Sequence, residues 1–60
     1  MQLRYENYLI TQTLTEQGYE ILYRHRHKPN EYELVTGIAS KIDALKVVKE
    51  YLDKALEESQ

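Results

Sequence analysis

The spacing of apolar and polar residues changes character near residue 40 of this 60-residue chain. From Lys41 to Glu58, apolar residues recur at intervals of three and four, which is the spacing of an amphipathic helix. Ser40 precedes this run and Asp43 follows three positions later, a pattern that resembles a helix-capping box. We therefore expect one helix over about 41–58, with Ser40 as its N-terminal cap.

Two segments before this helix alternate apolar and polar residues with a period of two, as strands do. They cover about 19–26 and 32–38, and both are rich in aromatic or β-branched residues. Between them, residues 28–31 (KPNE) favour a turn, because proline presets φ and asparagine tolerates a left-handed backbone. Gly37 is expected to let the chain bend out of the sheet before the helix. The two segments therefore predict a β-hairpin.

The N-terminal segment fits two different elements. Its alternating threonines are dense in strand-forming character and favour a strand over about 5–15. The alternative is a helix over about 3–16 that ends at Gly18, which gives an αββα order. Alternating threonines are poor helix formers, so we favour the strand. The expected fold is α+β, a single domain over residues 1–60 in which a three-stranded antiparallel β-meander packs against one C-terminal α-helix (βββα).

The small size of the chain predicts self-association. A domain of this length buries only about 60% of its unfolded surface, so its stability is marginal. The sequence has no cysteine and only two histidines, which excludes a disulfide and makes a structural zinc ion unexpected. Oligomerisation is the remaining way to bury more surface, and we expect a homodimer.

Composition excludes several classes of protein. The net charge of −2 excludes a strongly basic nucleic-acid module and a polybasic membrane anchor. No apolar run approaches the roughly 20 residues of a transmembrane helix, and the first residues lack signal-peptide character. We expect a cytoplasmic protein that does not contact a membrane.

Few residues offer catalytic chemistry. The chain has no cysteine nucleophile and no glycine-rich phosphate loop, and Ser40 is explained by helix capping. His25 and His27 supply two ligands where a zinc site needs three or four. Glu31 and Glu33 are a poor acid–base pair, because no enclosing pocket is predicted around them. We expect no enzymatic activity, no metal site and no cofactor.

The strand pattern predicts an apolar patch on the face of the sheet that the helix leaves uncovered. Each strand offers one large apolar residue there, where a solvated face would be polar: Leu9, Leu22 and Val35. Such a patch favours a contact site for a partner protein. Tyr32 is a further expected anchor, and the expected acidic rim contacts are Glu20, Glu31 and Glu33.

A basic cluster offers an alternative function. Arg24, Arg26 and Lys28 fall on one side of a predicted strand as it approaches a turn, where they could contact phosphates. This pattern predicts, as the alternative, a sheet-based DNA-binding module. Several glutamates near the cluster oppose that interpretation, because they would repel a phosphate backbone.

Two short stretches, the chain length and the order of elements resemble the small dimeric uracil-DNA glycosylase inhibitors of phages. The stretches are 32–37 (YELVTG) and 52–56 (LDKAL). The resemblance implies a homodimer that mimics DNA and inserts an aromatic side chain, here Tyr32, into a hydrophobic recess of the enzyme. That family is rich in aspartate in its strand turns, whereas this chain has a basic cluster. The expected function is a small non-enzymatic binding protein, a phage-type inhibitor that docks on a host nucleic-acid-processing enzyme.

Overall fold

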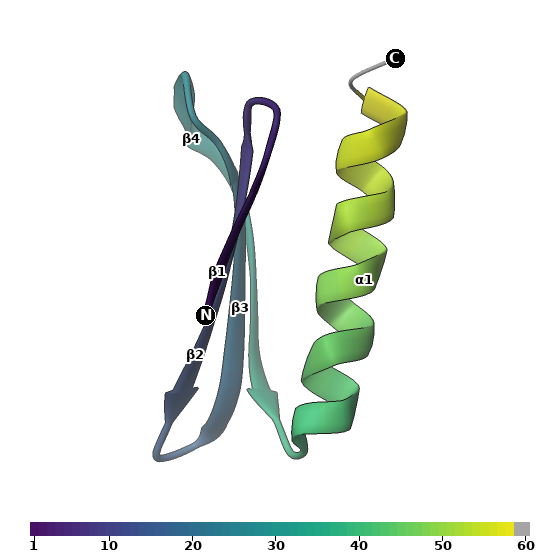
Figure 1. Ribbon diagram of the computed structural model, residues 1–60. Coiled ribbons are helices and arrows are strands. Elements are labelled where there is room, and N and C mark those ends of the chain that lie inside the picture. Colours follow the sequence, from purple (N-terminus) through teal and green to yellow (C-terminus); the bar gives the residue numbers. More distant parts are fainter. Residues whose placement is uncertain (59–60) are drawn as a thin grey trace.

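Four strands form one antiparallel sheet in sequence order, and a single helix runs along one face of it (Figure 1). The computed structural model describes residues 1–58. The strands are β1 (Gln2–Tyr5), β2 (Tyr8–Thr15), β3 (Gly18–His25) and β4 (Lys28–Ile38), and the helix is α1 (Lys41–Glu58). The α+β class and the C-terminal helix are confirmed, whereas the prediction of three strands is wrong because the sheet has four. No helix among the described residues is long and apolar enough to cross a membrane.

The additional strand is β1, which lies almost entirely before the strand predicted over 5–15, and a tight turn at Glu6 and Asn7 separates it from β2. Glu6 has a φ of 53°, a left-handed conformation of the kind that two-residue hairpin turns use. This conformation is uncommon for glutamate, so Glu6 is not a turn signal in the sequence, and the single Asn7 beside it does not mark the turn. The alternative helix over 3–16 is wrong, since the strands on both sides of the turn pair with each other in the sheet.

The turn between β3 and β4 lies at Arg26 and His27, earlier than the turn predicted at 28–31. The His27 amide donates a hydrogen bond of 3.1 Å to Nδ1 of His25, which helps to hold this tight turn. The KPNE segment forms the irregular beginning of β4, where the register between β3 and β4 shifts. Its proline lacks an amide hydrogen and is tolerated there because β4 is an edge strand.

A second shift in register, near the end of β4, decides which side chains face the helix. Tyr19 pairs with Ile38 and Ile21 pairs with Val35, so β4 has one more residue than β3 between these two pairs. Gly37, with a φ of 69°, provides the left-handed backbone in this bulge and remains part of β4. Since one extra residue exchanges the two faces of a strand, Val35 faces the helix together with Ile38.

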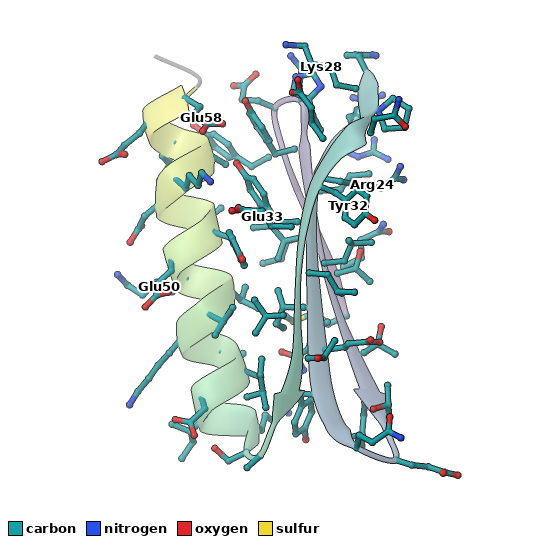
Figure 2. All side chains as sticks on the ribbon, turned by 180° about the vertical axis from the view of Figure 1, so that it is seen from behind. Arg24, Lys28, Tyr32, Glu33, Glu50 and Glu58 are labelled. Atoms are coloured by element: carbon teal, nitrogen blue, oxygen red, sulfur yellow. The ribbon has the colours of Figure 1, made fainter. Side chains whose placement is uncertain are left out.

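The bulge overturns the faces that strict alternation predicts for β4. Glu33 lies between the sheet and α1, whereas Tyr32 lies with Arg24 on the opposite side of the sheet (Figure 2). Leu34, between Glu33 and Val35, also faces away from the helix. The prediction that Val35 and Glu33 belong to the uncovered face is therefore wrong.

The core lies between α1 and the two central strands. Ile10 of β2 and Ile21 of β3 are the largest fully buried side chains, and small residues of α1 let the helix approach them closely. The Ser40 cap is confirmed, because Oγ of Ser40 accepts a hydrogen bond of 3.2 Å from the Asp43 amide. The buried cluster comprises Ile10, Ile21, Tyr23, Ala44, Val48 and Ala55.

Candidate functional site

The uncovered face of the sheet is organised in two rows, because residues that pair across antiparallel strands lie side by side on one face. One row ends on β4 with an aromatic side chain and the other with an aliphatic one. The first row is Arg4, Leu9, Arg24 and Tyr32, and the second is Gln2, Thr11, Leu22 and Leu34.

The exposed apolar side chains of this face lie at its β4 edge. Tyr32 is 60% exposed and Leu34 is 51% exposed, and Leu34 pairs directly with the half-buried Leu22. Leu9 is only 7% exposed, because it lies between Arg4 and Arg24, whose long aliphatic stems can shield it. The structure therefore puts Leu9 and Leu22 on the predicted face, with Leu34 in the place expected for Val35.

Charge on the uncovered face is positive. Arg4 and Arg24 lie on either side of Leu9, and Glu20, which pairs with Thr13, is the one carboxylate on the strand positions of this face. The acidic rim predicted from Glu31 and Glu33 does not form here, since both residues line a cleft on the helix side.

This cleft lies between the beginning of β4 and the end of α1, at the end of the molecule where Lys28 and Glu58 are found (Figure 2). It has a volume of about 310 Å³. Three of its residues are tyrosines, and Tyr32 is shared with the edge of the uncovered face. Its lining is Tyr8, Tyr23, His25, Lys28, Glu31, Tyr32, Glu33, Lys54 and Glu58.

Stacked aromatic rings form the wall of the cleft. The ring of Tyr23 stacks on Tyr8 at 5.4 Å and on Tyr51 of α1 at 4.8 Å. His25 contacts Tyr8 edge-to-face at 5.0 Å. These contacts fix the ring orientations and explain His25 as a packing residue. No group of three potential metal-ligating side chains occurs among the described residues.

Charged side chains at the mouth of the cleft are paired across elements. Nζ of Lys54 lies 2.9 Å from a carboxylate oxygen of Glu33 and 5.6 Å from the centre of the Tyr23 ring. The Glu33 carboxylate raises the pKa of Lys54. Glu58, in the last turn of α1, raises the pKa of the Tyr8 hydroxyl, chiefly because a hydrogen bond to its carboxylate favours the protonated phenol and also because its negative charge disfavours a phenolate.

The predicted basic cluster does not share one side of the sheet. Arg24 points away from α1, Arg26 lies in the turn, and Lys28 lines the cleft on the helix side. The prediction that these three residues form one row is therefore wrong. The cations that do share the uncovered face are Arg24 and Arg4, and the alternation around Arg4 covers only the four residues of β1, which the sequence does not predict as a separate strand.

The stability of the folded protein should depend on pH because of the Tyr23 hydroxyl. Tyr23 is 5% exposed, and its hydroxyl makes no well-aligned hydrogen bond among the described residues, although the Glu58 carboxylate lies near it. Burial raises its pKa above the ordinary value, so the folded state holds this proton more tightly than the unfolded state. We expect the resulting stability to be complete below about pH 10 and to fall above it, by up to about 1.4 kcal/mol per pH unit.

Tyr23→Phe tests this expectation by urea unfolding at neutral and alkaline pH. At neutral pH the variant should be more stable by about 1 kcal/mol, because a buried hydroxyl without a well-aligned hydrogen bond is removed. Its decline above pH 10 should be shallower than that of the wild type. Tyr32→Phe, which removes the hydroxyl of an exposed ring, is the control and should leave stability at neutral pH unchanged. Equal alkaline decline in Tyr23→Phe and the wild type would contradict the assignment.

Fold and surface define a small α+β protein with one helix-covered and one uncovered sheet face. Comparison of the chain with protein families, with characterised proteins and with solved structures finds no match.

Proposed function

We propose that this chain is a small non-enzymatic binding protein that docks on a partner protein through the uncovered face of its sheet. The observation that carries the proposal is the exposed apolar edge formed by Tyr32 and Leu34 beside Leu22. Tyrosine buries a large area at low cost in side-chain entropy and keeps a polar hydroxyl, which suits it to interfaces. A sheet face that faced only water would be polar at these positions.

The charged residues on this face indicate which kind of partner surface would be complementary to it. Arg24 lies beside Tyr32 and Arg4 lies at the far end of the same row, so the complementary surface is an apolar recess with Asp or Glu at its rim. Mimicry of DNA, which the resemblance to the glycosylase inhibitors implies, needs carboxylates on the docking face. Since Glu31 and Glu33 lie on the helix side, we propose docking by apolar contact, with Glu20 as the remaining acidic rim residue. The proposed partner is a host nucleic-acid-processing enzyme, and uracil-DNA glycosylase is the first candidate to test.

Two variants test this surface directly. Tyr32→Ala and Leu34→Lys change exposed side chains and should leave the fold intact. Each should weaken partner binding roughly tenfold or more, because exposed aromatic and aliphatic anchors dominate interfaces of this kind. Glu50→Ala, on the side of α1 that points away from the sheet, is the matched control and should bind like the wild type (Figure 2). The measurement is binding to purified uracil-DNA glycosylase, with inhibition of uracil excision as a second readout.

A lysate pull-down with the same variants tests the surface when the glycosylase does not bind. The proposal is supported by a protein, identified by mass spectrometry and then purified, that Tyr32→Ala and Leu34→Lys lose and Glu50→Ala retains. Capture that is indifferent to Tyr32 and Leu34 contradicts it, as does a lysate from which the wild type captures no protein.

Nucleic-acid binding is the second candidate, favoured by the row in which Arg4 and Arg24 lie with Tyr32. An aromatic ring in one row with two cations is an arrangement that can stack a base while the cations contact the phosphates of the strand. In this case, labelled single- or double-stranded DNA should bind with an affinity that falls steeply with salt, and Arg24→Glu should abolish binding. Lys41→Glu, the same charge reversal at the start of α1, should preserve it. An apolar protein contact responds weakly to salt, so the salt dependence separates the two candidates.

A further inference from the structure

Helix α1 carries a second apolar stripe, distinct from the one that packs on the sheet. The buried positions Ala44, Val48 and Ala55 face the core. The second stripe follows the 3-4-3-4 spacing of a coiled-coil seam and comprises Ile42, Leu45, Lys49, Leu52 and Leu56. A helix that needed only to cover the sheet would be polar along this line.

The second stripe lies on an exposed flank of the helix. Ile42 is 69% exposed and Leu45 is 44% exposed, and Leu52 is half-buried at the border of the core. Lys54 marks the opposite flank, which lies over β4, because it pairs with Glu33. The stripe therefore lies on the side of β1, the edge strand at the other end of the sheet.

Charged residues beside the stripe are complementary to the same residues of a second copy of the helix. Lys46 and Asp53 lie in equivalent positions along the same border of the stripe, one heptad apart. In an antiparallel pair of such helices, Lys46 of one copy lies near Asp53 of the other, and twofold symmetry repeats the contact. A parallel pair would instead place Lys49 beside Lys49 in the seam and Lys46 near Lys41 of the other copy, and both contacts are repulsive. The stripe is thus complementary to itself in the antiparallel orientation only.

We propose that α1 pairs antiparallel with α1 of a second copy, through the stripe of Ile42, Leu45, Lys49, Leu52 and Leu56. Ile10 and Ile21 are the largest fully buried side chains among residues 1–58, and the sequence has no cysteine for a disulfide, so a domain with so small a core gains stability from this contact. Lys49, which bonds Asp53 at 3.2 Å, puts one polar residue within the seam, a feature that selects a single register. This interface leaves the uncovered face of the sheet free, and it does not depend on the proposed function.

Sedimentation over a wide dilution series tests the dimer and its surface together. The wild type should change from dimer to monomer on dilution, and Leu45→Lys should weaken self-association on the order of a hundredfold, because a lysine replaces a buried leucine twice in the interface. Leu34→Lys, the same change at a similarly exposed position of the uncovered face, should leave the dimer unchanged. A wild type that is monomeric throughout, or a dimer lost in Leu34→Lys and kept in Leu45→Lys, overturns the proposal.

A charge exchange tests the antiparallel orientation without altering the apolar seam. Lys46→Glu and Asp53→Lys each turn two attractive contacts into two repulsive ones, and each should weaken self-association roughly tenfold. When the two variants are mixed, the heterodimer regains both attractive contacts and should form with near wild-type affinity. Circular dichroism verifies that both variants remain folded. If the single variants associate like the wild type, or the mixture does not recover, the antiparallel arrangement is wrong.

Discussion

Replacing Ile21 by alanine leaves much of the protein unfolded at room temperature. Ile21 is 0% exposed at the centre of β3, where it pairs with Gln12 on one side and Val35 on the other and packs in the cluster beneath α1. Truncation of a buried isoleucine costs about 2–5 kcal/mol, since the lost contacts leave a cavity. A core of this size supplies only about 3–5 kcal/mol of stability, so the variant loses most of its free energy of unfolding.

The measurement is urea unfolding followed by far-ultraviolet circular dichroism at a fixed protein concentration. Leu14→Ala is the control, because it deletes the same number of carbon atoms from a side chain that is 67% exposed. It should change the free energy of unfolding by less than about 0.5 kcal/mol. If Ile21→Ala lost no more stability than Leu14→Ala, the core would not lie where β3 and α1 meet.

The helix could be predicted from the sequence because its signals are local. A period of three and four continues without interruption from Lys41 to Glu58, and Ser40 stands where a cap is needed. A capping hydrogen bond joins residues three positions apart, so the sequence alone contains both partners. The prediction of β3 also succeeds to within a residue, since its alternation is regular and it lies between two neighbouring strands.

The faces of β4 could not be predicted, because a bulge is a property of two strands and not of one. Strict alternation from Tyr32 to Ile38 puts both on the same face, and the extra residue at Gly37 separates them. That single irregularity moved Val35 and Glu33 to the helix side and brought Tyr32 and Leu34 to the uncovered face. Gly37 was a visible signal, but a glycine at the end of a strand fits a bend toward the helix equally well.

The cleft depends on contacts between residues far apart in the sequence. The pair of Lys54 and Glu33 spans 21 positions and joins the helix to an edge strand, so no local pattern marks it. Tyr8 and Tyr23 stack because β2 and β3 place them on neighbouring strands of the same face. The abundance of tyrosine predicts aromatic contacts of this kind but not their positions.

Replacing Gly18 by alanine destabilises the sheet by about 2–5 kcal/mol, well beyond the cost of the same change at Gly37. Gly18 begins β3 with a φ of 116°, and a Cβ there would lie 2.6 Å from the backbone oxygen of Ile38 in β4. Backbone cannot rotate aside as a side chain can, so β4 must shift away from β3 where α1 is connected. At Gly37, which has a φ of 69°, no atom lies within 4 Å of an added Cβ. Alanine there should therefore cost only the strain of a left-handed backbone, about 1–2 kcal/mol. Thermal unfolding of both variants measures the difference; equal losses would show that backbone conformation alone, and not the approach of β4, requires glycine at position 18.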